Sequence, residues 1–183
     1  MSSANRSTAP LLHCLEEDAA MIHHISLPVE EPLHVAQVLA ELINGKVAPF
    51  PFNPNSYLVF AGDAYGTMFE FYPVGTELMP GGASSPVTFS QNAFASPFTA
   101  VHAAISVPAS EAQIAEVGER EGWQTVRCDR GPFQVIEFWI ENKLMLELLP
   151  APLTTQYLNS MKPENLAQFF AGASVPKPAA VTA

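Results

Sequence analysis

The chain has 183 residues, enough for one compact domain or for two small halves that share a core. Hydrophobic residues make up 48% of it, yet no apolar run approaches the roughly 18 residues needed to cross a bilayer. Eight Lys and Arg against 18 Asp and Glu give a formal net charge of −10. Without a basic cluster, this balance argues against nucleic acid as a partner, and nothing indicates a membrane.

Residues 1–20 are expected to form a flexible N-terminal tail, because small polar residues dominate and no signal-peptide core follows. The two cysteines, Cys14 and Cys128, show neither paired spacing nor a disulfide framework. A cytoplasmic location is therefore expected.

Residues 21–75 predict a first βαβββ unit. Residues 21–29 alternate as a strand, and Pro32 suits the first turn of a helix that Asn44 and Gly45 close. The apolar stripe of this helix consists of Val35, Val38, Leu39 and Leu42. Three short extended runs follow, at 46–52, 57–61 and 67–72.

Residues 76–100, rich in Gly, Pro and Ser, are expected to link this unit to a second one at 101–150. A strand at 101–107 precedes a helix that starts at the capping box Ser110 to Gln113 and ends at Gly122. Three more strands are predicted at 124–128, 133–140 and 144–149. Residues 151–183 are expected as a partly disordered extension with a short helix around 164–170.

The two units look like an internal repeat. Met68–Pro73 resembles Met145–Pro150, 77 residues later, and His24 resembles His102, 78 residues later. Landmarks at one constant offset are the signature of repeated structure. The fold class is therefore predicted as α+β, with two βαβββ units in tandem that form curved mixed sheets around a cleft and carry helices on the outer face.

Strand alternation sorts the repeated residues onto two faces. One face of each strand is apolar. The opposite face carries His24, Glu70, His102 and Glu147, together with Ser26, Met68, Tyr72, Ser106 and Met145. A single His or Glu on a strand is more often an ordinary polar residue than a ligand. The common face and constant offset of these four favour one divalent-cation site, with the other five lining a substrate pocket.

Paired βαβββ units with a His in the first strand and a Glu in the fourth resemble the vicinal oxygen chelate superfamily. The superfamily includes glyoxalase I, bleomycin-resistance proteins, methylmalonyl-CoA epimerase and type I extradiol dioxygenases. The resemblance covers about 21–150 and implies His24, Glu70, His102 and Glu147 as the metal ligands. A full His-Glu-His-Glu set is similar to glyoxalase I, whereas the dioxygenases use two His and one Glu.

The resemblance implies a lyase or isomerase for a small substrate with two adjacent oxygens, with Glu70 or Glu147 as the proton-transfer group. The ligand set suits Ni, Zn, Co, Fe or Mn without choosing among them. An Fe(II) extradiol-type dioxygenase and a metal-free small-molecule binding protein remain as alternatives. A homodimer is also expected, because units of this kind leave strand edges to be covered. Whether the cleft forms within one chain or between two stays open.

Overall fold

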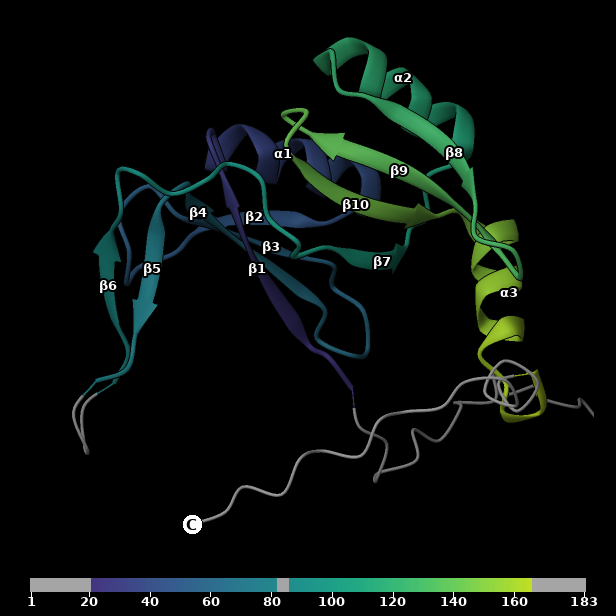
Figure 1. Ribbon diagram of the computed structural model, residues 1–183, viewed down its shortest axis with the longest axis horizontal. Coiled ribbons are helices and arrows are strands. Elements are labelled where there is room, and N and C mark those ends of the chain that lie inside the picture. The colour runs from purple at the N-terminus through teal and green to yellow at the C-terminus, as the bar shows by residue number, and fades with distance from the viewer. Residues whose placement is uncertain (1–20, 82–85, 166–183) are drawn as a thin grey trace, which may run out of the picture.

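The computed structural model describes residues 21–81 and 86–165 (Figure 1). The predicted tail at 1–20 and most of the helix predicted at 164–170 lie outside these ranges. Within them, no helix combines the length and the apolar character that crossing a membrane requires.

The first unit has the predicted order of elements. It consists of β1 (His24–Val29), α1 (Pro32–Ile43), β2 (Lys46–Pro49), β3 (Tyr57–Phe60) and β4 (Met68–Pro73). The strand order is β1-β4-β3-β2, with β1 parallel to β4 and the other neighbours antiparallel. Asn44 ends α1 in the left-handed conformation, with φ 53°. Gly45 follows where a Cβ atom would come within 2.8 Å of the Phe60 carbonyl oxygen, so only glycine fits.

The second unit repeats this topology. It consists of β7 (Ala103–Ser106), α2 (Glu111–Glu121), β8 (Thr125–Asp129), β9 (Gln134–Ile140) and β10 (Leu144–Leu149), in the order β7-β10-β9-β8. The capping box between Ser110 and Gln113 is present, and Gly122 ends α2 with φ 69°. The predicted α+β class is therefore confirmed: two βαβββ units form two mixed four-stranded sheets with helices packed on them.

Two elements were not predicted. A hairpin of β5 (Thr76–Met79) and β6 (Thr88–Gln91) lies within the segment expected as a linker, and α3 (Ala151–Ser160) directly follows β10. The helix α3 is separate from the helix predicted around 164–170, most of which lies outside the described residues. It is held in place by buried Leu153 and by Tyr157, whose ring meets Phe133 edge-on at 4.9 Å.

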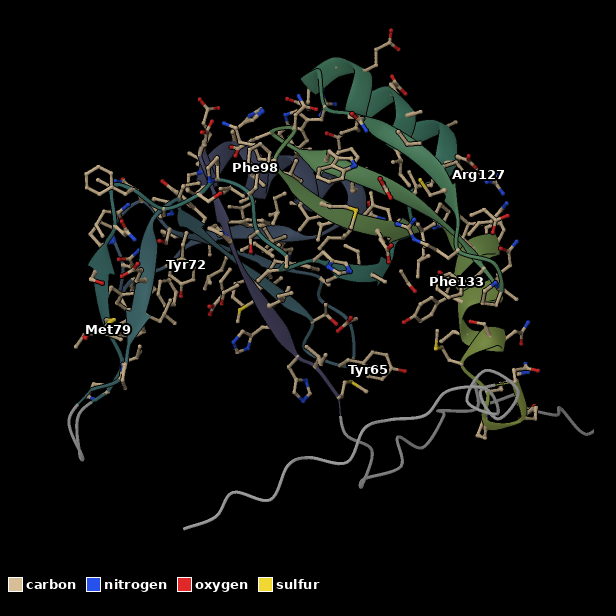
Figure 2. The ribbon with its side chains drawn as sticks, viewed as in Figure 1. Tyr65, Tyr72, Met79, Phe98, Arg127 and Phe133 are labelled. Atoms are coloured by element: carbon tan, nitrogen blue, oxygen red, sulfur yellow. The ribbon has the colours of Figure 1, made fainter. Side chains whose placement is uncertain are left out.

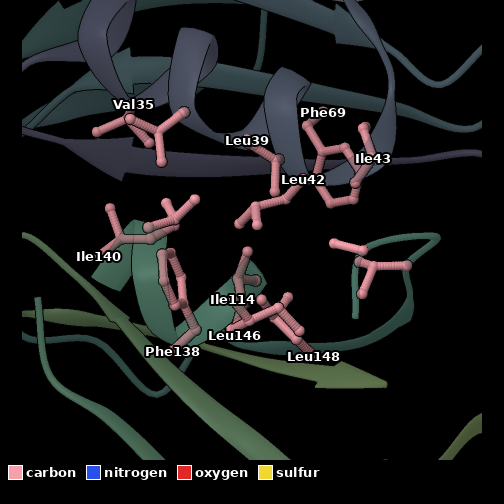
Figure 3. Close-up of a cluster of buried hydrophobic side chains, with 14 of the residues drawn as sticks. Val35, Leu39, Leu42, Ile43, Phe69, Ile114, Phe138, Ile140, Leu146 and Leu148 are labelled. Atoms are coloured by element: carbon pink, nitrogen blue, oxygen red, sulfur yellow. The ribbon is translucent and has the colours of Figure 1, made fainter. Parts of the chain in front are cut away.

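Both sheets contribute to one hydrophobic core. Figure 3 shows apolar side chains of α1, among them Val35 and Leu39, directed toward Phe138 and Leu146 of the second sheet. The predicted alternation is confirmed, because Leu27, Phe69, Phe71, Leu146 and Leu148 are each at most 2% exposed. The alternate residues of each strand, which include the candidate ligands, consequently face away from this core.

Polar contacts also join the two units. The Glu141 carboxylate, in the β9–β10 turn, accepts hydrogen bonds from the backbone N–H groups of Glu30 and Glu31 at 2.6 and 2.7 Å. These groups lie at the start of α1, where free N–H groups and the helix dipole favour an anion. Glu141 therefore caps the helix of the first unit from the second.

Charged side chains near the end of α2 extend this junction. Glu121 contacts His34 of α1 at 2.7 Å, and Arg120 reaches Glu41 of α1 at 2.8 Å while its Nε donates to Glu121 at 2.7 Å. The Arg120 guanidinium, and after it His34, hold the pKa of Glu121 below its ordinary value. The ionised form of Glu121 is thus the one that stabilises the junction.

Replacing Glu121 should give a pH-dependent loss of stability. A depressed carboxyl pKa contributes stability above the unfolded-state pKa of about 4.3, and this contribution is lost as the pH falls through the folded pKa. Glu121→Gln should lower the free energy of unfolding by about 0.5–1 kcal/mol at neutral pH, and by less in acid, at a pH below the unfolded-state pKa. Denaturant unfolding at the two pH values measures the effect.

Glu119→Gln is the matched control, since Glu119 is exposed on the same helix and has no ion-pair partner within residues 21–81 and 86–165. Its unfolding free energy should not change at either pH. A loss in Glu121→Gln that persists in acid would contradict the assignment.

Candidate functional site

The two predicted His and Glu pairs occupy equivalent positions in the two sheets. In the parallel pairing of β1 with β4, Ser26 lies opposite Glu70, so His24 precedes the partner of Glu70 by two residues. In the pairing of β7 with β10, Ala104 lies opposite Glu147, and His102 again precedes that partner by two. Because residues two apart share a face, each unit has one Glu on its polar face and one His of matching parity, His24 at the start of β1 and His102 just before β7.

One chain does not bring these two pairs together. Across the described parts of the chain, no three His, Cys, Asp or Glu side chains lie close enough to hold a metal ion. The four predicted ligands form no such group within the described residues of one chain, and the four-ligand site stays a prediction.

Glu70 is held by two hydroxyl groups. Ser26 Oγ donates to Glu70 Oε2 at 2.6 Å, and the Tyr72 hydroxyl donates to the same oxygen at 3.0 Å. Glu70 Oε1 has no hydrogen-bond partner among the described residues. The carboxylate is therefore fixed through one oxygen and free at the other.

Tyr72 is covered by the β5–β6 hairpin. Figure 2 labels Tyr72 near this hairpin. Its ring stacks on Phe89 of β6 at 5.8 Å and meets Phe50 edge-on at 5.6 Å, and the residue is only 4% exposed. Burial, with the hydrogen bond to Glu70 adding to it, raises the pKa of Tyr72 well above its ordinary value. Tyr72 thus belongs to an aromatic cluster with half-buried Phe50 and Phe89 and orients Glu70, and its role as a pocket residue stays a prediction.

Glu147 is engaged by a cation that the sequence analysis did not identify. Arg130 donates from Nε and Nη2 to Glu147 Oε1 at 3.1 and 2.9 Å, and its Nη2 also donates to Glu137 Oε1 at 2.7 Å. Glu137 lies directly opposite Glu147 in the pairing of β9 with β10. Trp139 Nε1 donates to the second oxygen of Glu137 at 3.0 Å.

This environment keeps Glu137 ionised. Arg130 first, and then the Trp139 hydrogen bond, hold the pKa of Glu137 below its ordinary value. The sequence holds one signal for Glu137, its position between the apolar residues Ile136 and Phe138, which are both buried. Strand alternation then places Glu137 on the polar face. No comparable signal marked Arg130, which lies in a turn.

The two histidines are exposed. The ring N–H at Nδ1 of His102 donates to the Ala100 carbonyl at 3.0 Å, an arrangement that leaves Nε2 with its lone pair. His24 has no side-chain hydrogen bond among the described residues. Of the other predicted pocket residues, Met68 and Met145 are half-buried, while exposed Ser106 accepts a hydrogen bond from Thr154 of α3 at 3.1 Å.

The donor set is compatible with a divalent cation. Each Glu keeps one carboxylate oxygen without a protein partner in the described ranges, and each unit offers an imidazole on the same face. Imidazole and carboxylate donors suit first-row divalent metals. Arg130, which contacts Glu147, carries a charge that opposes a cation there.

No protein-family model matches the sequence, and no curated protein sequence matches it. Solved structures do match. The fosfomycin resistance protein FosX from Listeria monocytogenes, complexed with Mn(II) and a sulfate ion, is 12% identical, with a TM-score of 0.48 over 77% of this chain and 97% of its own. A putative dioxygenase from Bacillus subtilis is 18% identical, with a TM-score of 0.44 over 70% of this chain and 40% of its own.

A glyoxylase/bleomycin resistance protein/dioxygenase domain from Frankia sp. is 13% identical, with a TM-score of 0.43 over 71% of this chain and 96% of its own. All of these structural matches are at low sequence identity. The match concerns the fold.

The Tyr72 phenol should titrate later than an ordinary tyrosine. The chain has four tyrosines, so the contribution of this one is isolated by subtracting the tyrosinate absorbance of Tyr72→Phe from that of the unmodified protein. Because the Tyr72 pKa is raised, the difference should stay flat as the pH passes the ordinary value of about 10. A step in the difference near that value would show that the phenol is neither buried nor bound to Glu70.

Proposed function

We propose that the protein is a metal-dependent lyase or isomerase that acts on a small substrate with two adjacent oxygens. Its metal ligands are His24 and Glu70 from one copy and His102 and Glu147 from a second copy of the chain. The observation that carries the proposal is the equivalent register of the two His and Glu pairs on polar faces that point away from the shared core.

The two glutamates have different roles in this proposal. When bound, the divalent ion supplies Lewis-acid stabilisation of negative charge that develops on the substrate oxygens. Glu70 is the proton-transfer group, because Ser26 and Tyr72 hold one of its oxygens and leave Oε1 free to accept a proton. Glu147, which pairs with Arg130 in the metal-free chain, serves in this proposal as a metal ligand only.

The substrate class follows from the surroundings of Glu70. Half-buried Met68 lies on the same face, and the aromatic cluster of Phe50, Tyr72 and Phe89 borders it. These groups favour a substrate that pairs its two oxygens with an apolar portion. The proposed substrates are hydroxy-ketones, diketones or hemithioacetals, and the reaction involves no net redox change. Localisation in the cytoplasm is part of the same proposal.

A metal-free binding protein is the second candidate. It is favoured because both carboxylates already bind other residues of the protein. Two hydroxyl groups donate to Glu70, and Arg130 pairs with Glu147. In that case the polar faces would bind a small molecule without a cation.

An Fe(II) extradiol-type dioxygenase, which needs two His and one Glu, would tolerate loss of Glu70.

Loss of a single histidine should abolish tight metal binding. His24→Ala and His102→Ala should each weaken Ni²⁺ or Mn²⁺ affinity by more than about 100-fold, because loss of a partner that only orients a ligand already costs about 10–100-fold. Calorimetric titration of untagged protein, freed of metal by a chelator, gives the affinities. His23→Ala is the control, since strand parity places His23 on the other face. Unchanged affinity in both ligand variants would contradict the assignment.

The chain should be a homodimer in solution. Among residues 21–81 and 86–165, no further strand pairs with the outer edges of the two four-stranded sheets, and the proposed ligand set is incomplete without a second copy. Light scattering coupled to gel filtration should give twice the chain mass of 19.7 kDa. A mass of one chain at high micromolar concentration is the contrary result.

Activity should appear without oxygen. Protein loaded separately with Ni²⁺, Zn²⁺ and Fe²⁺ is assayed anaerobically for isomerisation of hydroxy-carbonyl and hemithioacetal substrates, and aerobically for oxygen uptake with catechols. The proposal predicts turnover in the anaerobic assay and its loss in Glu70→Gln. Activity confined to the aerobic iron form would establish the dioxygenase instead, and tight ligand binding without any turnover would establish the binding protein.

A further inference from the structure

Glu137 and Glu147 form a carboxylate pair on the polar face of the second sheet. They lie directly opposite each other on β9 and β10, with exposed side-chain fractions of 17% and 12%. Like charges in directly opposed cross-strand positions destabilise a sheet. Arg130 resolves this conflict because one guanidinium nitrogen, Nη2, donates to both carboxylates.

The position of Arg130 is set by a tight turn between β8 and β9. The backbone N–H of Arg130 donates to the Phe133 carbonyl at 2.9 Å, and the next N–H, that of Gly131, donates to the Asp129 carboxylate at 2.7 Å. Gly131 adopts φ 85°, which favours glycine. The turn therefore fixes the backbone of Arg130, whose guanidinium can bind Glu137, Glu147 or both.

The two carboxylates are not held equally. Glu137 is bound through both oxygens, by Arg130 on one and by Trp139 on the other. Glu147 is bound through Oε1 alone, and Oε2 has no partner among the described residues. Because the guanidinium has five N–H donors, it can keep Glu137 when Glu147 is withdrawn. Glu147 is thus the partner that can be released.

We propose that Arg130 is a built-in competitor for the metal ion: it neutralises Glu147 in the metal-free chain and transfers to Glu137 alone when a divalent cation takes Glu147. This inference rests on the proposed function, since it concerns a ligand of the same site. A guanidinium 2.9 Å from a ligand oxygen repels a cation that approaches that oxygen. Glu137 is a positioning residue that makes release of Glu147 possible.

The test is a series of four variants titrated with Ni²⁺ and Mn²⁺ by calorimetry. Arg130→Met should tighten metal binding by about tenfold or more, the usual size of coupling between two binding events. Glu137→Gln should weaken it by a similar factor, because Arg130 then has Glu147 as its only anionic partner. Arg130→Lys keeps the charge and should stay within a few-fold of the unmodified protein.

Arg127→Met is the matched control. Arg127 lies on the neighbouring strand β8 (Figure 2) and pairs with Glu111 and Gln134. Replacing it with Met therefore makes the same chemical change as Arg130→Met but removes no contact to Glu147. Its metal affinity should equal that of the unmodified protein. Circular dichroism and thermal unfolding of each variant establish that the chain is folded, and the opposite signs expected for Arg130→Met and Glu137→Gln separate competition from general damage.

The outcomes distinguish this inference from the proposed function. If the unmodified protein binds metal and neither Arg130→Met nor Glu137→Gln changes the affinity, Arg130 is not a competitor and the inference is overturned while the metal site stands. If only Arg130→Met binds metal, the competition is established and the native chain is not a metalloenzyme. If no variant binds metal, both are overturned.

Discussion

The arrangement depends on one constraint: both sheets turn their apolar residues into a single core. Because successive side chains of a strand point to opposite faces, the remaining side chains face away from this core. Leu27 and Phe71 in the first sheet and Leu146 and Leu148 in the second are all fully buried, and the His and Glu residues alternate with them. Burial of the apolar faces therefore turns the two polar faces outward, and each polar face holds half of the proposed ligand set.

The two units have the same strand topology, but Glu70 and Glu147 are surrounded by different residues. Glu70 is surrounded by hydroxyl groups and by an aromatic cluster that the β5–β6 hairpin completes. Glu147 is surrounded by Arg130 and a second carboxylate. Neutral hydrogen-bond donors orient a carboxylate without cancelling its charge, whereas a guanidinium cancels it. The two polar faces therefore differ in the charge that surrounds their glutamates.

The features that sequence predicts here are those fixed by local physics. The period-two alternation identified which face of each strand is buried, and the capping box at Ser110 and the left-handed ends at Asn44 and Gly122 fixed both helices. The hairpin was missed because two four-residue strands are marginal alone and depend on packing against Tyr72. Arg130 was missed because its contact with Glu147 arises from the conformation of a turn, which composition does not reveal.

The central claim is that one site takes half of its ligands from each of two chains, and a mixing experiment tests it most directly. Neither a His24→Ala/Glu70→Gln variant nor a His102→Ala/Glu147→Gln variant should bind metal alone. Unfolded together and refolded as a mixture, they form hybrid dimers in which one site regains all four ligands. The account predicts that the mixture binds metal with native affinity, at one ion per hybrid dimer. Failure of the mixture to bind metal, with hybrid dimers demonstrated by mass spectrometry, would contradict it.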